Sequence, residues 1–128
     1  MKIKKVIATE SQEQKALINW LDLHPILKNY YFKIPNEGKR SEIFGWTLKR
    51  EGLKQGVSDL FIFYPTKSFH GLFLEMKRNR IYTNSEKKNK TWTAQQDFLE
   101  RAQKVGYAGE FCFGWEHAVK FIEDYLKN

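Results

Sequence analysis

Two runs of aromatic and aliphatic residues in the middle of the chain constrain its fold most strongly. The first is DLFIFY at residues 59–64, and the second is GLFLEMK at residues 71–77. Both are rich in residue types that favour β-strands, and the intervening segment 65–70 contains turn-forming residues. The pattern therefore predicts a β-hairpin that forms the centre of a sheet.

Helical and extended patterns flank this hairpin in a mixed order. Apolar residues recur at helical spacing in 12–23, 93–105 and 117–126, and more weakly in 42–51, whereas 30–34 and 108–113 are typical of strands. Trp92, Phe98 and Trp115 fall at apolar positions and are expected in the core. We predict an α/β or mixed α+β fold, with a small mixed sheet flanked by helices.

Length and composition limit the classes of protein to consider. A chain of 128 residues, 41% of them hydrophobic, is expected to form a single domain over residues 1–128. Neither a membrane span nor a secretory signal is evident, so we expect a cytoplasmic protein. Cys112 is the only cysteine, which excludes an internal disulfide and a thiolate zinc cluster and favours a buried thiol.

The basic residues of the chain are concentrated in its middle. The net charge is +7, and residues 37–90 hold 12 basic and 6 acidic side chains. This surplus favours a polyanion partner such as nucleic acid or an anionic membrane surface, although a solubilising surface remains an alternative. Residues 78–90 look like a mobile loop that grips phosphates, or simply a solvated one. The candidate DNA-binding residues are Lys39, Arg40, Lys54, Arg78, Arg80, Lys87, Lys88 and Lys90.

Three ionic residues of the hairpin indicate a metal site. Glu75 and Lys77 share one face of the second strand because side chains alternate, and the hairpin returns them beside Asp59. The Glu-x-Lys pattern is weak alone, since it occurs four times and an exposed ion pair would explain it. Two facing carboxylates, however, repel without a cation between them. Asp59, Glu75 and the backbone carbonyl of Met76 could therefore hold Mg²⁺, with Lys77 orienting water or stabilising charge.

Five segments of the chain also match a known pattern. They are residues 10–14 with their helix, 34–41, 52–60, 72–77 and 93–99. Together they make the sequence resemble the VRR-NUC nucleases, a branch of the PD-(D/E)XK superfamily that includes small stand-alone phage and bacterial proteins. The resemblance covers nearly the whole chain and implies a restriction-endonuclease-like core.

The resemblance also implies a role for each site residue. Asp59 and Glu75 would be metal ligands, Lys77 the catalytic lysine, Glu10 the first-helix acid near the metal, and Gln95 the glutamine that faces the site. Glu13 is an alternative to Glu10, because residues three apart share a helix face. Ser58 replaces the proline usual before the aspartate, which affects the backbone more than the chemistry.

These observations predict a Mg²⁺- or Mn²⁺-dependent endodeoxyribonuclease that uses a metal-activated water. The family implies a preference for branched DNA such as Holliday junctions or flaps. A homodimer is expected because one small domain offers one cleft, with an apolar helix face or residues 111–113 as its interface. The alternatives are a catalytically weak nucleic-acid-binding module and a basic ribonuclease.

Overall fold

The computed structural model describes residues 6–35 and 49–128. Lys39, Arg40 and most of the predicted helix over 42–51 lie outside these ranges. The elements in chain order are α1 (Glu10–Leu23), the 3₁₀ helix η1 (Leu27–Asn29), β1 (Tyr31–Lys33), β2 (Leu60–Ile62), β3 (Leu72–Lys77), α3 (Asn84–Lys87), α4 (Lys90–Lys104), β4 (Ala108–Phe113) and α5 (Trp115–Leu126). The fold is mixed α+β, as the sequence predicts.

The four strands form one mixed sheet in the order β1-β2-β3-β4. β1 pairs with β2 and β2 with β3 in antiparallel fashion, so the predicted hairpin is confirmed. β4 pairs with β3 in parallel, from Leu72 opposite Ala108 to Lys77 opposite Phe113. A parallel neighbour requires a crossover, and α3 and α4 provide it.

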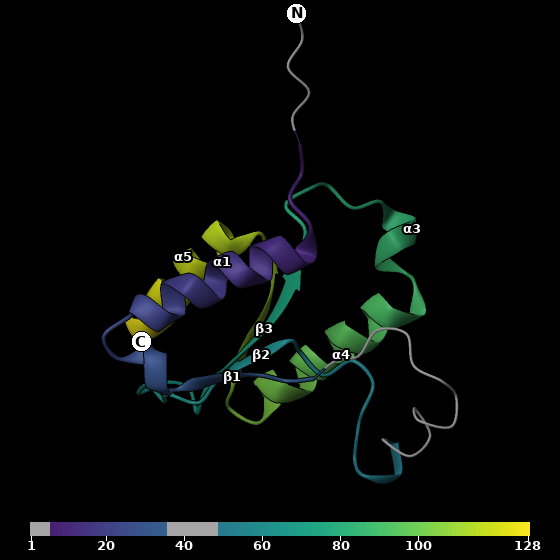
Figure 1. The fold of residues 1–128 in the computed structure, drawn as a ribbon. Coiled ribbons are helices and arrows are strands. Elements are labelled where there is room, and N and C mark those ends of the chain that lie inside the picture. Colours follow the sequence, from purple (N-terminus) through teal and green to yellow (C-terminus); the bar gives the residue numbers. More distant parts are fainter. Residues whose placement is uncertain (1–5, 36–48) are drawn as a thin grey trace, which may run out of the picture.

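The main core lies between the sheet and the pair α1 and α5, which lie side by side on one face (Figure 1). Leu72, Leu74 and Met76 of β3 point into this core and are fully buried. Leu17 and Leu21 of α1 meet them from the helix side. Because side chains alternate along β3, Phe73, Glu75 and Lys77 face the opposite side of the sheet.

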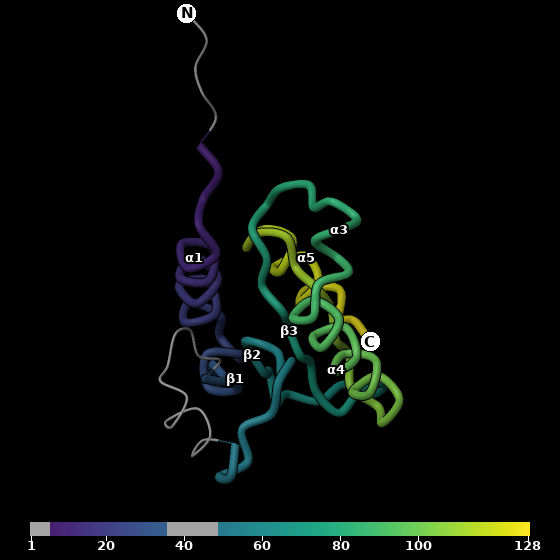
Figure 2. The backbone as a smooth tube through the Cα atoms, turned by 90° about the vertical axis from the view of Figure 1, so that its right-hand side faces the viewer, coloured from purple at the N-terminus to yellow at the C-terminus, as the bar shows by residue number. Residues whose placement is uncertain are grey.

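That opposite face is covered by α4, which lies across the strands from α1 (Figure 2). Trp92 stacks on Phe111 with ring centroids 4.8 Å apart, and Phe98 meets Phe73 edge to face at 5.1 Å. Trp92 is buried, and Trp115 packs against the main core, as predicted. Glu75 and Lys77 therefore lie in a layer that also contains the first turns of α4.

The segment predicted as a mobile loop contains a capped helical turn. The Thr83 hydroxyl accepts a hydrogen bond from Glu86 N, and the Glu86 carboxylate accepts one from Thr83 N. This reciprocal capping box forms α3. Asn89 then caps α4 by accepting from Trp92 N at 2.7 Å. The sequence prediction missed this helical turn because basic composition concealed two adjacent capping signals.

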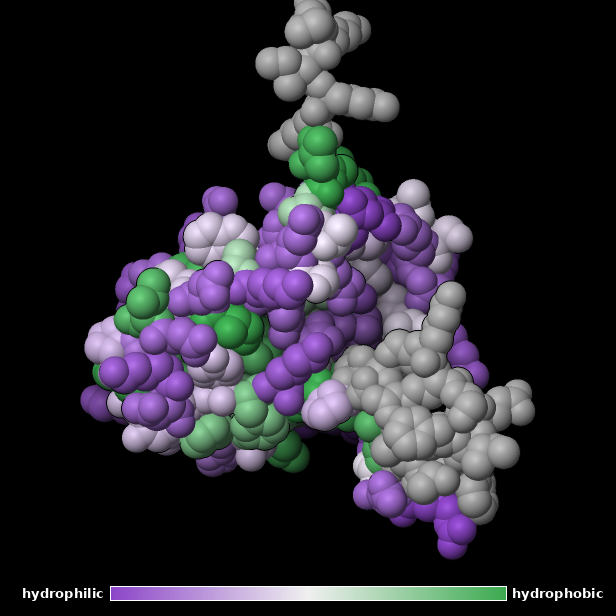
Figure 3. Space-filling model, in the orientation of Figure 1, coloured by the Kyte–Doolittle hydropathy of each residue, from purple (hydrophilic) through white to green (hydrophobic). Residues whose placement is uncertain are grey.

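Hydrophilic side chains cover most of the face formed by α1 and β1 (Figure 3). Within the two described ranges, no helix is long and apolar enough to cross a membrane.

Candidate active site

The Asp59 and Glu75 carboxylates meet where the β2–β3 ladder ends. The last paired residues are Leu60 and Leu74, and beyond them each carboxylate binds the backbone of the other strand. Asp59 N donates to Glu75 Oε2 at 3.2 Å, and Met76 N donates to Asp59 Oδ2 at 2.9 Å. Two acidic side chains are therefore fixed side by side by main-chain donors.

A close approach between the loop before β2 and α4 positions Asp59. Gly56 has a φ of +81°, and a Cβ there would lie 2.3 Å from the carbonyl oxygen of Ala94. Only glycine avoids both the strain and the clash. Ser58, which replaces the usual proline, is 1% exposed and thus buried beside the site. The loop therefore packs closely against the turn of α4 that also carries Gln95.

The Lys77 side chain lies on the α4 side of the sheet, where several groups surround its ammonium nitrogen. Its Nζ donates to Gln95 Oε1 at 2.7 Å and lies 3.9 Å from Glu75 Oε1. The same nitrogen lies 4.8 Å from the centroid of the Trp92 ring and 5.7 Å from that of Phe111. Gln95 is buried, with 6% of its surface exposed. An amide, a carboxylate and an aromatic face together fix the ammonium group.

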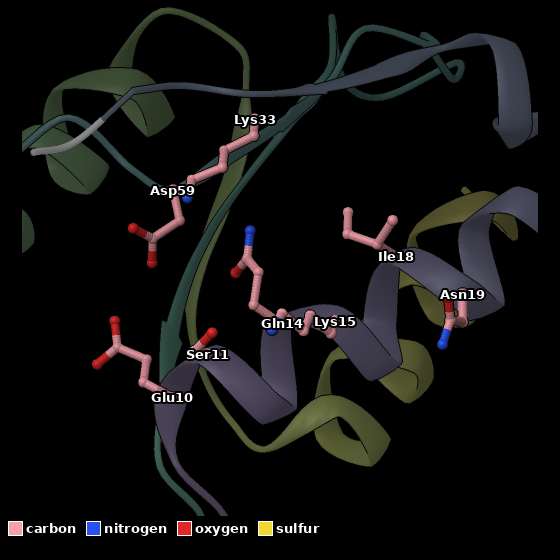
Figure 4. A pocket seen from close by; sticks show the side chains of 8 residues that line it. All are labelled: Glu10, Ser11, Gln14, Lys15, Ile18, Asn19, Lys33 and Asp59. Carbon is pink, nitrogen blue, oxygen red and sulfur yellow. The ribbon is translucent and has the colours of Figure 1, made fainter.

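The two acids of the first helical turn have different surroundings. Glu13 Oε2 accepts a hydrogen bond from Trp115 N at 2.5 Å and so caps α5, whose N-cap Gly114 has no side chain for this purpose. Glu10 instead faces Asp59 across a gap (Figure 4). The structure therefore places Glu10, rather than Glu13, beside the two strand carboxylates.

The pKa values of all three carboxyl groups are raised. Burial raises the pKa of Glu75 to about 9, with a further contribution from the Asp59 charge, while Lys77 opposes the shift. Burial also raises the pKa of Asp59, although the hydrogen bond from Met76 N lowers it. For Glu10, loss of surrounding water is the larger cause of the raised pKa and the Asp59 charge the smaller. The Asp59 charge thus makes both Glu10 and Glu75 harder to ionise, a conflict that a cation would relieve.

The donor set fits a hard divalent cation. Mg²⁺ prefers oxygen ligands and is commonly held by one or two carboxylates, with water and phosphate oxygens completing the shell. Asp59 and Glu75 supply two carboxylates. The Lys77 carbonyl accepts from Gly114 N on the β4 side, so the Met76 carbonyl points toward β2, where the ladder has ended. In the described part of the chain, no three His, Cys, Asp or Glu side chains converge as a metal-binding group, so Glu10 lies outside such a set.

The predicted DNA-binding residues divide into two groups. The Arg78 guanidinium donates to the backbone carbonyls of Ile7 and Ala8, and Arg80 forms a bidentate ion pair with Glu86 while stacking on Tyr82. Both arginines are therefore engaged within the chain. The remaining described candidates have exposed side chains: Lys54, Lys87, Lys88 and Lys90.

Some residues near the site were not assigned to it from the sequence. Trp92 was predicted as core only, although its ring also lies under Lys77. Gln14, Lys15 and Lys33 line a groove that begins at Glu10 and Asp59. The four-residue spacing of Glu10 and Gln14 was visible, but nothing local connects Lys33 with this helix.

The mixed sheet with helices on both faces is consistent with a restriction-endonuclease-like fold, and the carboxylate pair beside a lysine lies at the end of one of its strands. A solved structure described as a VRR_NUC domain protein shares this fold, with a TM-score of 0.75 and 25% sequence identity. The match covers 95% of this chain and 91% of that one. The chain therefore shares the fold of a VRR-NUC domain. No family model and no curated protein matches the sequence.

Proposed function

We propose that this chain is a metal-dependent nuclease that hydrolyses phosphodiester bonds in DNA. The observation that carries the proposal is the pair of carboxylates, Asp59 and Glu75, fixed by crossed backbone hydrogen bonds beside Lys77. Such a group is costly to assemble, because the two buried acids repel one another. A site that binds a divalent cation accounts for this cost better than a stabilising ion pair does.

Each residue has a defined task in the proposed reaction. Asp59, Glu75 and the Met76 carbonyl would hold Mg²⁺ or Mn²⁺, which polarises the phosphate and acidifies a bound water. Lys77 orients the attacking water or stabilises the charge that develops on the phosphate. Gln95 holds Lys77 in place through the 2.7 Å hydrogen bond. Glu10 would add negative charge at the edge of the site, next to Asp59.

We further propose that Lys54, Lys87, Lys88 and Lys90 contact DNA phosphates, together with Lys39 and Arg40. The family resemblance supports branched DNA as the preferred substrate and a homodimer as the active form. Two equivalent clefts would suit a junction with two equivalent scissile strands.

The test is incubation of the full chain with plasmid, linear duplex, flap and four-way-junction DNA, and with RNA of matched sequence. Each substrate is tested in Mg²⁺, in Mn²⁺ and in EDTA. The proposal expects cleavage of DNA in either metal and none in EDTA. Binding without cleavage in both metals would support a non-catalytic binding module instead, and cleavage restricted to RNA would support a ribonuclease.

A further inference from the structure

A groove of about 440 Å³ lies between α1 and the end of β1, with the Glu10 and Asp59 carboxylates at one end (Figure 4). Side chains spaced four apart on α1 share a helix face, so two adjacent rows line it. These rows are Glu10, Gln14 and Ile18, and Ser11, Lys15 and Asn19. Lys33 of β1 closes the other side. The groove falls within the range of roughly 300–1,000 Å³ typical of small-ligand pockets.

The charge of this groove changes sign along its length. Glu10 and Asp59 give its inner end a negative charge, whereas Lys15 and Lys33 are exposed lysines on its walls. The Lys33 charge is close enough to Asp59 to oppose the rise in the pKa of that carboxyl group. An anion that approaches the carboxylates along the groove would therefore meet two cations that draw it in.

Gln14 supplies a hydrogen-bond donor that no described residue of the chain accepts. Its side chain extends from α1 into the groove, toward Lys33 and Asp59 (Figure 4). The Nε2 atom is buried and has no acceptor within the described residues. A buried donor without a partner destabilises a fold, so such a group at a site boundary points to a ligand. Ile18 adds an apolar surface one turn further along the same row.

We propose that this groove binds the DNA nucleotide next to the scissile phosphate. Lys15 and Lys33 contact its phosphate groups, Gln14 donates to a phosphate or base oxygen, and Ile18 contacts the sugar or base. The inference rests on the proposed nuclease function, because the carboxylates at the inner end define where the scissile phosphate lies. The groove thus adds a second DNA-binding surface to the one proposed for the 78–90 segment.

The test compares two double variants that remove the same amount of charge. The groove variant is Lys15→Ala with Lys33→Ala. The control is Lys67→Ala with Lys104→Ala, because both lysines are exposed at the hairpin end of the sheet, away from the carboxylates. Binding of a short fluorescein-labelled DNA strand and of its duplex is measured by anisotropy over a range of salt, in EDTA to prevent cleavage. Cleavage rates over a range of DNA concentration are measured in Mg²⁺.

The groove variant is expected to bind DNA more weakly than the control. The slope of log affinity against log salt should become shallower by roughly 0.7 to 0.9 for each phosphate that the variant no longer neutralises. KM should rise by a larger factor than kcat at saturating DNA falls, because both lysines are assigned to substrate binding. If the groove variant and the control behave alike while wild-type protein binds and cuts DNA, the groove assignment is wrong and the nuclease function stands. A wild-type chain that neither binds nor cuts DNA overturns both.

Gln14 gives a second, independent test. Gln14→Leu removes the donor, and Gln14→Glu keeps the size but adds a negative charge. Both should weaken DNA binding, the Glu variant more strongly. The Leu variant should not lower Tm, because the Nε2 atom has no hydrogen-bond partner among residues 6–35 and 49–128 to lose. A Leu variant that binds DNA normally but unfolds at lower temperature would show that Gln14 is structural and overturn its assignment.

Discussion

The ring of Trp92 lies beneath the ammonium group of Lys77, 4.8 Å from its centroid, while Gln95 from the next turn of α4 accepts the Lys77 hydrogen bond. The helix that packs the sheet thus also fixes the direction of the lysine. A cation over an aromatic face gains about 0.5–2 kcal/mol, depending on how far it is desolvated. Trp92 is therefore a positioning residue in this account, acting through Lys77.

We predict that Trp92→Leu lowers kcat by about twofold to thirtyfold, the range that corresponds to that energy, while Trp92→Phe retains most of it. Rates are corrected for the folded fraction measured by circular dichroism, since Trp92 also stacks on Phe111. A purely structural role would lower the folded fraction of both variants but leave kcat per folded molecule unchanged.

The buried Glu75 carboxyl predicts how stability changes with pH. Its pKa rises from 4.5 to about 9 in the folded chain without metal, so the folded state keeps a proton that the unfolded state releases. The free energy of unfolding should therefore fall as pH increases through this window. Denaturant unfolding in EDTA measures this fall, and Glu75→Gln should reduce it. Added Mg²⁺ should stabilise the protein more at high pH than at low pH; equal stabilisation across the window would contradict the assignment.

At the scale of the elements, α1 serves both the core and the site. Leu17 and Leu21 pack against the sheet, Glu13 caps α5, and Glu10 faces Asp59. The capping box of Thr9 and Gln12 fixes where the helix begins and hence where Glu10 lies. If the helix began one residue earlier or later, Glu10 would no longer face Asp59 and Glu13 would no longer accept from Trp115 N.

Substitutions of Glu13 and Glu10 should therefore have opposite effects on stability and on cleavage. Glu13→Ala should lower the free energy of unfolding by about 0.5–2 kcal/mol, the usual effect of losing a helix cap, with little change in kcat. Glu10→Gln should reduce cleavage without lowering stability, because it removes a charge that repels Asp59. Unfolding curves and cleavage rates of the two variants distinguish the roles, and reversed phenotypes would assign the site acid to Glu13.

The elements that sequence predicted well are those with a strong local pattern. The hairpin and β4 have alternating or apolar runs between turn residues, and α4 and α5 have helical periodicity. The observed α4 begins at Lys90 rather than at residue 93, because Asn89 provides the cap. The Glu75 and Lys77 arrangement follows directly from strand alternation. The groove could not be predicted, because Lys15 of α1 and Lys33 of β1 line one surface only in the folded chain.

At the scale of the whole molecule, the edge of the sheet bears on the proposed homodimer. Three peptide groups at the outer edge of β4 are engaged within the chain: Phe111 N donates to Glu110, Phe113 N donates to His117, and Gly109 O accepts from Gln103. Such contacts oppose strand pairing between two copies. The side chains of Phe111 and Phe113 are also stacked on Trp92. The 111–113 strand is therefore a poor interface.

A better dimer interface is the face of β1 and β2 that lies on the same side of the sheet as α4. Phe32 and Phe63 are 48% and 42% exposed, and both contact Phe61. If two copies pair through this aromatic surface, Phe32→Ser with Phe63→Ser should convert the dimer to a monomer. Ile81→Ser is the control, because Ile81 is 93% exposed but lies in the segment after β3. Light scattering of each protein, with and without four-way-junction DNA, measures the oligomeric state. A monomeric wild type in both conditions would exclude the dimer.

The central claim is that Asp59 and Glu75 bind the metal on which DNA cleavage depends. The most direct measurement is plasmid cleavage by wild-type and Glu75→Gln protein in Mg²⁺, with EDTA as the blank and circular dichroism to verify folding. Glutamine keeps the size of the side chain and an acceptor for Asp59 N, but it removes the charge. We predict that the wild type cleaves in Mg²⁺ and not in EDTA, and that the folded variant loses at least about a hundredfold in rate. Cleavage by Glu75→Gln at the wild-type rate would contradict it.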